Sequence, residues 1–238
     1  MSQSFKFSEN ILSFYEQFDE ANRFSIGAFQ LELARTQELL RRYLPAPPAA
    51  IYDIGGGPGV YAGWLAKLGY EVHLLDPVPH HIEQAKKLSN RQPDHPIASF
   101  TIEDARRLDY ANSAADVVLS LGPLYHLVNR NERIAALKET HRVLKKNGML
   151  FAAAISRFAS TLDGLIQGFL TDPEFARIAK RDLQDGQHLN PSGNLAYFTE
   201  SYFHGVNELE QEIAEAGLAL EQTLVIEGPG WLLQNFDD

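Results

Sequence analysis

A short segment starting at residue 51 constrains the fold of this chain more than any other feature. The run Ile-Tyr-Asp-Ile at 51–54 has the composition of a buried strand, and Gly-Gly-Gly-Pro-Gly at 55–59 follows directly. Glycine has no Cβ, so such a run permits a sharp turn and a close approach of the backbone to a ligand. A helix follows, and its free N–H groups point toward whatever binds there. The segment therefore predicts a site for a nucleotide-like cofactor.

Strand and helix patterns alternate after this turn. Such alternation is typical of a parallel sheet with helices on both faces, so we predict an α/β fold with a doubly wound, mostly parallel sheet. The expected strands are 49–54, 71–75, 97–102, 116–121 and 148–155, and the expected helices are 59–68, 79–89 and 131–145.

Helical segments flank this core on both sides. Apolar residues recur at helical spacing over 9–44, and two more helical stretches, 162–169 and 174–185, interrupt the alternation later. A final helix is expected at 207–216, because Asn207 and Glu210 have capping-box spacing, followed by a strand at 218–227. The expected parts are an N-terminal lid at 1–48, a cofactor-binding core at 49–156, an insertion over the substrate site at 157–205, and a final helix and strand at 206–238.

Composition excludes several classes of function. The 238 residues carry a formal net charge of −10, and basic residues form only scattered pairs such as Arg106-Arg107, which we expect on solvated helix faces. Binding to nucleic acid needs clustered Lys and Arg, so we expect no nucleic-acid partner. The chain contains no cysteine, hence no thiolate zinc site and no Cys nucleophile. Without a signal-like or membrane-length apolar run, we expect a cytoplasmic protein with no membrane partner.

Two cofactors fit the glycine turn. Residues 57–62 match Gly-x-Gly-x-x-Ala, with Asp76 about 20 residues further on, as in a nicotinamide-dependent oxidoreductase. However, three expected strands end in acidic residues, at Asp53, Asp76 and Glu103-Asp104. Carboxylates gathered at one sheet edge repel a pyrophosphate and attract a cationic ligand that carries hydroxyl groups.

These motifs resemble those of the class I S-adenosylmethionine-dependent methyltransferases over roughly residues 50–155. The turn at 53–59 is similar to the family's first motif, and Asp76 to the acid that accepts hydrogen bonds from both ribose hydroxyls. Asp104-Ala105 is similar to the pair that reads adenine. Residues 115–122 and 142–150 are similar to the fourth strand and to the helix, turn and strand after it. The resemblance implies the Rossmann-like methyltransferase fold, with a sheet of the seven-stranded type.

The resemblance also implies a reaction. The cofactor would be S-adenosyl-L-methionine, converted to S-adenosyl-L-homocysteine by in-line transfer of its methyl group to a small-molecule acceptor. Ser120 and Gly122 offer no acidic ligand at the sheet edge, so we expect no metal. The expected cofactor contacts are Tyr15, Arg23, Asp53, Gly55, Gly57, Asp76, Pro77, Asp104, Ala105 and Leu121.

His126 is the candidate general base or substrate-orienting residue, with Tyr125 beside it. Both follow the fourth strand, and ligands bind at the carboxyl ends of strands in such sheets. The alternative is that His126 caps the next segment or hydrogen-bonds a backbone carbonyl.

Residues outside the core are expected to shape the acceptor pocket. We expect Phe18 of the lid to face the substrate. We also expect Tyr197, Tyr202 and His204 from the insertion, because Tyr and His offer polar tips on apolar bodies. In the lid, Arg23 or Tyr15 would bind the cofactor's carboxylate.

Each of these roles has a structural alternative. The rings of the insertion can instead form its core, which we favour for Phe198 and Phe203, and Arg23 can simply pair with Glu20 on a helix surface. Adjacent residues on a helix point in different directions, so we expect His80 and His81 at the surface or the cofactor rim and not at a shared metal.

Two alternative functions stay open beside methyl transfer. The function can be that of an NAD(P)-dependent oxidoreductase or of a non-catalytic S-adenosylmethionine-binding protein. Few residues follow Glu227, so the family's seventh strand is expected to be short, missing or cut off. An uncovered edge strand invites pairing with another chain, which makes a homodimer a possible partner.

Overall fold

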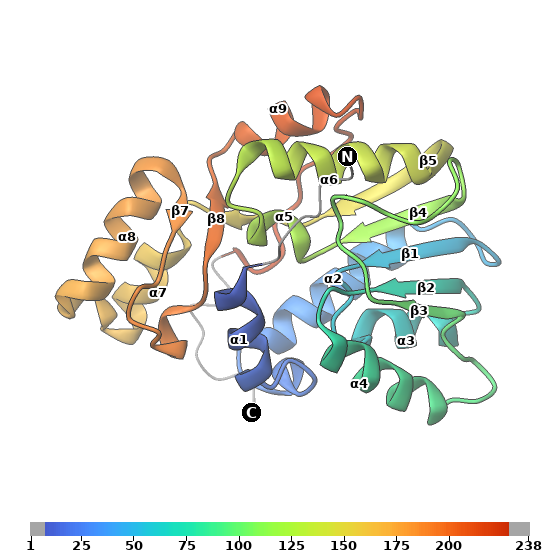
Figure 1. Cartoon of the computed structure of the whole chain (residues 1–238), viewed down its shortest axis with the longest axis horizontal. Helices are drawn as coiled ribbons and strands as arrows, with labels where there is room; N and C mark the ends of the chain where they lie inside the picture. Colours follow the sequence, from blue (N-terminus) through green and yellow to red (C-terminus); the bar gives the residue numbers. More distant parts are fainter. Residues whose placement is uncertain (1–7, 229–238) are drawn as a thin grey trace.

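The centre of the molecule is a parallel sheet of five strands, seen in a computed structural model that describes residues 8–228. The strand order reverses between β1 and β4, which leaves a crevice outside the carboxyl ends of these two strands. The predicted doubly wound α/β class is therefore confirmed (Figure 1). In spatial order the strands are β3 (Ser99–Thr101), β2 (Glu71–Leu75), β1 (Ala50–Ile54), β4 (Ala115–Ser120) and β5 (Leu144–Ala152).

Apolar side chains alternate along the strands and so line both faces of the sheet. Ile51 and Leu119 belong to a core that includes α2, α3 and α4, whereas Tyr52 and Val118 pack on the opposite face with the end of α6. Helices α5 and α9 pack with α6 beside this second face. These helices are α2 (Phe29–Tyr43), α3 (Val60–Lys67), α4 (Pro79–Asn90), α5 (Pro123–His126), α6 (Arg130–Val143) and α9 (Glu208–Glu215).

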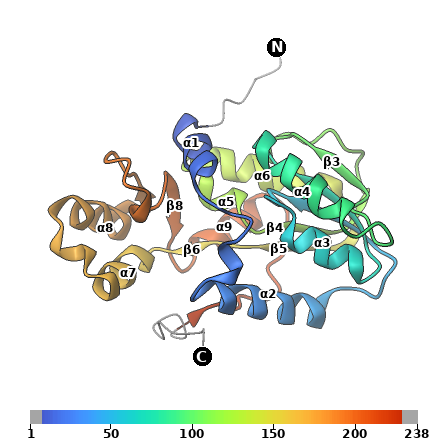
Figure 2. The same cartoon turned by 90° about the horizontal axis from the view of Figure 1, so that it is seen from below.

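The N-terminal region is not continuously helical as its apolar spacing predicts. It divides into α1 (Glu9–Gln17), η1 (Arg23–Ser25) and α2. Phe18 ends α1 with extended backbone angles, φ −89° and ψ 129°, and Gly27 turns the chain with φ 48° before α2 begins. In both views α1 lies between the sheet region and the helices that follow β5 (Figure 1, Figure 2).

Residues after β5 form a second group of elements, on the left of Figure 1. The two expected helices are present, and Phe175 and Ile178 of α8 form a small core with Tyr197 of η3. Prediction missed the strand β8, which pairs in parallel with β6 and antiparallel with β7. The elements are β6 (Ile155–Ser156), α7 (Ala159–Gln167), η2 (Phe169–Thr171), α8 (Pro173–Asp185), β7 (Gln187–His188), η3 (Leu195–Tyr197) and β8 (Ser201–His204).

Two predictions for the C-terminal region are wrong. The Asn207 side chain makes no capping bond to α9; instead the Glu208 carboxylate accepts the Gly205 N–H at 2.7 Å. Residues 218–227 form no strand, so β5 is the edge of the sheet in the described part of the chain. Val225 is 67% exposed, which shows that the β-like alternation of this segment does not bury an apolar face.

Candidate functional site

The glycine turn lies at the crevice between the ends of β1 and β4. Gly55, Gly57 and Gly59 have φ angles of 70°, 54° and 84°, in the left-handed region that favours glycine. A Cβ added to Gly55 would lie 2.6 Å from Pro123 Cγ at the start of α5. The turn is therefore both strained for other residues and tightly packed.

The predicted strand-end acids meet at this edge. Asp53 and Asp76 are buried, and Asp104 lies half-buried beside Glu103. Burial, and to a smaller extent the charge of Asp76, raises the pKa of Asp53 to about 7. The Ala62 N–H binds the Asp53 carboxyl group, yet its Oδ2 has no hydrogen-bond partner among the described residues.

A cavity of about 100 Å³ opens at this edge. All of the expected cofactor contacts line it, together with the two expected catalytic residues: Tyr15, Arg23, Asp53, Gly55, Gly57, Asp76, Pro77, Asp104, Ala105, Leu121, Tyr125 and His126. The structure thus brings together residues from α1, the glycine turn, α5 and the ends of β2, β3 and β4.

Tyr15 and His126 form a hydrogen-bonded pair in this cavity. The Tyr15 hydroxyl lies 2.7 Å from His126 Nε2, and His126 Nδ1 lies 3.5 Å from the Glu200 carbonyl oxygen. A carbonyl can only accept, so Nδ1 carries the ring proton and the Tyr15 hydroxyl donates to Nε2. The expected alternative, a bond from His126 to a backbone carbonyl, is therefore also present.

Burial sets the charge state of this pair. It lowers the pKa of His126 to about 4, against smaller opposing effects of the Glu200 carbonyl and Asp76. Burial also raises the pKa of Tyr15 well above its ordinary value, as does the neighbouring Tyr125. Both members of the pair are consequently neutral at pH 7.

Arg23 lines the cavity and is already paired. Its Nε donates to Glu20 at 2.9 Å, and its two terminal nitrogens both donate to Glu32. The Glu20–Arg23 pair that we considered as an alternative does form, but on the cavity wall, where the two side chains are only 17% and 16% exposed.

Two basic residues beside the strand-end acids are more deeply buried than expected: Arg106 was expected on a solvated face, and His81 at the surface or the cofactor rim. Arg106 is not on a solvated face: it is 5% exposed, its Nε donates to Asp104 Oδ1 at 2.8 Å, and its Nη1 lies 2.8 Å from a Glu132 oxygen. His81 is 3% exposed and lines the cavity, with Nδ1 at 3.1 Å from Asp76 Oδ1. The only signal for either was proximity in sequence to a predicted strand-end acid.

None of the four residues expected in the acceptor pocket lines this cavity. Phe18 stacks on Phe14, with ring centroids 5.2 Å apart. Tyr197 belongs to the small core that it forms with α8, and its hydroxyl donates to Asp172 at 2.7 Å. Tyr202 and His204 are held by a buried charge network instead.

That network joins the core to the insertion. Arg133 on α6 donates to both oxygens of Glu212 on α9, and its guanidinium carbon lies 3.5 Å from the centre of the Tyr202 ring. His204 Nε2 lies 3.4 Å from Glu212. Burial opposes ionisation of Glu212, but hydrogen bonds from His204 and Arg133 outweigh it and lower its pKa to about 2.

Phe198, which we favoured as core, packs beside the cavity-lining His126. Its ring centroid is 5.8 Å from that of His126 and 5.5 Å from that of Phe14. Its φ is 64°, a value that non-glycine residues rarely adopt and that tends to persist at functional sites.

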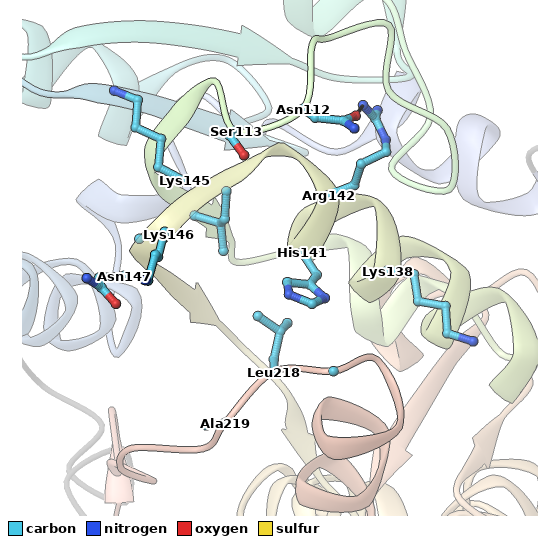
Figure 3. A pocket seen from close by; sticks show the side chains of 13 residues that line it. Asn112, Ser113, Lys138, His141, Arg142, Lys145, Lys146, Asn147, Leu218 and Ala219 are labelled. Carbon is cyan, nitrogen blue, oxygen red and sulfur yellow. Dashed lines mark hydrogen bonds between the residues drawn. The ribbon is translucent and has the colours of Figure 1, made fainter.

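A larger hollow of about 610 Å³ lies at the other end of the sheet, near the starts of β4 and β5 (Figure 3). His141 and Leu218 point toward its centre, whereas Lys138 and Lys145 point away. Lys145 is paired with Asp116, and His141 Nδ1 lies 3.1 Å from the Ala216 carbonyl oxygen. This hollow is far from the glycine turn and the strand-end acids, so the smaller cavity is the candidate site.

Comparison with known proteins agrees with this geometry. Residues 52–152 match a family described as a methyltransferase domain. Residues 52–152 therefore form a methyltransferase domain, of the class I S-adenosylmethionine-dependent type. Relatives include "Methyltransferase GfsG" of Streptomyces halstedii, 28% identical over 141 residues, which are 57% of this chain and 49% of the relative. "Uncharacterized methyltransferase YodH" of Bacillus subtilis is 32% identical over 125 residues, 52% of this chain and 51% of the relative.

A solved structure shares the fold of the methyltransferase domain. An S-adenosylmethionine-dependent methyltransferase of Methanosarcina mazei has a TM-score of 0.60 at 22% identity, covering 75% of this chain and 82% of that one. The chain spans about half the length of the two curated relatives. The family and these relatives are methyltransferases, so the nicotinamide alternative finds no support.

The chemistry of the cavity fits the cofactor of a methyltransferase domain. Buried atoms without a partner among the described residues, Asp53 Oδ2 and His81 Nε2, belong to cavity-lining side chains. The volume is smaller than the roughly 300–1,000 Å³ of typical small-molecule sites, and Tyr15 of α1 and Arg23 of η1 form part of the cavity wall. No cluster of three or more metal-ligating side chains, and no helix fit to span a membrane, occurs within residues 8–228.

Proposed function

We propose that this chain is an enzyme that transfers the methyl group of S-adenosylmethionine to a small-molecule acceptor. The observation that carries the proposal is the single cavity at the carboxyl ends of the strands, which combines the expected cofactor contacts with the Tyr15–His126 pair. The N-terminal segment would act as its lid, and residues 157–205 as a cap that supplies the Glu200 carbonyl.

The cofactor contacts follow from the chemistry of the cavity wall. The Asp104 carboxylate would accept the adenine amino group, and Asp76 would accept from the ribose. The backbone at Gly55 and Gly57 would lie along the methionine part, with Arg23 near its carboxylate. When bound, the cofactor supplies a methyl group on a positively charged sulfur, so the acceptor atom displaces a good leaving group in line.

The Tyr15–His126 pair would remove a proton from the acceptor. The acceptor's O–H or N–H donates its proton to the Tyr15 oxygen while the Tyr15 hydroxyl passes its own proton to His126 Nε2. This transfer requires a neutral His126, and burial keeps its pKa near 4. Tyr125 and Phe198 border the pair and would help to exclude water.

Calorimetric titration tests the cofactor. We expect micromolar binding of S-adenosylmethionine and S-adenosylhomocysteine, and none of NADH. Binding of NADH alone would overturn the proposal and restore the oxidoreductase alternative.

Turnover with screened acceptors then separates an enzyme from a non-catalytic binding protein. With an acceptor in hand, Tyr15→Phe and His126→Asn should each lower kcat by about 100-fold, and His126→Asn should leave the affinity for S-adenosylhomocysteine nearly unchanged. A His126→Asn enzyme with full kcat would remove this residue from the chemistry.

We further propose a cytoplasmic enzyme with no nucleic-acid or membrane partner, in line with its acidic balance and its lack of cysteine. A second copy is the partner that the free edge of β5 favours. Analytical ultracentrifugation distinguishes a dimer from a monomer directly.

A further inference from the structure

The hydrogen-bonding capacity of Asp76 is nearly used up within the protein. Its Oδ2 accepts the Gly57 N–H at 2.9 Å. Its Oδ1 accepts the Val78 N–H at 2.9 Å and also faces His81 Nδ1 at 3.1 Å. An ionised carboxylate offers about four lone-pair sites, so one remains, on Oδ2. Asp76 alone therefore has room for one further donor, whereas a ribose presents two neighbouring hydroxyls.

His81 offers the missing acceptor. Because the Asp76 carboxylate accepts, His81 Nδ1 carries a proton toward it, and in the ring tautomer protonated at Nδ1 alone Nε2 keeps a free lone pair. His81 is 3% exposed and lines the cavity, and its Nε2 is buried with no partner among the described residues. A buried polar atom without a partner is destabilising unless a ligand satisfies it.

The ring is also fixed in place. Its Nδ1 lies 3.9 Å from the position that a Cβ on Gly57 would take, so the imidazole packs close to the glycine turn. The Tyr15 ring meets the His81 ring edge to face, with centroids 5.3 Å apart. His81 is thus held between the glycine turn and α1, and its Nε2 has no hydrogen-bond partner among the described residues.

We propose that His81 is a cofactor-binding residue that shares the ribose diol with Asp76: Asp76 Oδ2 accepts from one hydroxyl and His81 Nε2 from the other. The inference rests on the proposed use of S-adenosylmethionine. It assigns to His81 a contact that the family resemblance gives to the acid alone. It also explains why a polar atom stays buried and unpaired at this position.

Calorimetry with three ligands tests the assignment. The probes are S-adenosylhomocysteine and its 2′-deoxy and 3′-deoxy analogues, titrated into the wild-type chain, His81→Phe and His80→Phe. His80 is exposed and adjacent, which makes His80→Phe the matched control. In the wild-type chain we expect each missing hydroxyl to weaken binding about tenfold, because each has its own acceptor.

The His81→Phe variant decides the matter. We expect it to bind S-adenosylhomocysteine about tenfold more weakly and to lose discrimination against one of the two deoxy analogues only, while His80→Phe behaves as wild type. Undiminished discrimination against both analogues in His81→Phe would overturn the inference. The inference would also be overturned if the wild-type chain bound one of the deoxy analogues as tightly as S-adenosylhomocysteine. That result does not depend on the folding of any variant. Failure of the wild-type chain to bind S-adenosylhomocysteine at all would instead reject the proposed function.

Discussion

Among individual residues, His126 shows most directly how the site's environment sets a charge. Its pKa is about 4 in the folded chain and 6.5 ordinarily, so the unfolded chain binds the proton first as the pH falls. Stability is therefore lost from pH 6.5 downward until the folded chain also becomes protonated near pH 4. Burial of the neutral His126 side chain thus makes the stability of the folded chain depend on pH.

We expect this residue to lower the free energy of unfolding by about 2 kcal/mol between about pH 7.5 and about pH 5. Urea denaturation at both pH values measures the change, and the His126→Asn variant should lack this part of it. The same pH dependence in the variant and the wild-type chain would contradict the buried neutral state.

A second prediction at this scale concerns Asp104. Removing its carboxylate should weaken binding of S-adenosylhomocysteine at least about tenfold, because a buried donor on the ligand loses its acceptor. Calorimetry measures this with Asp104→Ala, and Asp94→Ala, which changes an exposed acid, serves as the control. Equal affinities for the two variants would place the adenine elsewhere.

The sequence was informative for residues whose position in a motif fixes their place in space. Asp53, Asp76 and Asp104 follow parallel strands, so they had to meet at one edge. The contacts of Arg106 with Asp104 and of His81 with Asp76 escaped prediction, because they depend on which acid each residue touches after folding. Tyr197 and Tyr202 do not line the cavity, since aromatic character predicts burial but does not say in which core.

At the scale of elements, the glycine turn allows two effects of a Gly→Ala substitution to be measured separately: the strain of a left-handed backbone and the packing of the added Cβ. Gly55 and Gly193 have φ angles of 70° and 69°, but only Gly55 has a neighbour where a Cβ would go. Gly55→Ala and Gly193→Ala should each lower the free energy of unfolding by roughly 1–2 kcal/mol, because alanine disfavours the left-handed backbone conformation. Gly55→Ala should cost about 1–3 kcal/mol more, because Pro123 must move.

Thermal unfolding of the two variants measures this difference. Because the φ angles match, comparison with Gly193→Ala removes the backbone effect of a positive φ and leaves the packing effect. If the two variants are equally stable, the turn is not packed against α5 as described.

Elements with their own local signals were predictable, and those that depend on a neighbour were not. The strands β1, β2 and β4 combine apolar runs with clear turns, and they form close to the expected positions. Residues 218–227 have a strand-like pattern but pair with no strand. The four residues of β8 form a strand only because β6 and β7 lie on either side.

At the scale of the whole molecule, the Arg133–Glu212 pair joins parts that are distant in sequence. Both side chains are 1% exposed, so removing one charge leaves the other buried without its partner. Arg133→Met should lower the free energy of unfolding by about 3–5 kcal/mol. The double variant Arg133→Met/Glu212→Leu should recover part of this loss, and chemical denaturation measures both. A double variant no more stable than the single one would mean that the loss comes from packing.

The position of this network has a consequence for how the chain melts. Arg133 comes from a helix of the core, Glu212 from the last helix, and Tyr202 and His204 from a strand of the insertion. The insertion cannot separate from the core without breaking the buried Arg133–Glu212 network and leaving its charges unpaired. Partial unfolding is therefore nearly as unfavourable as complete unfolding. The insertion should therefore behave as part of one cooperative unit, and scanning calorimetry should record a single heat-absorption peak for the described regions.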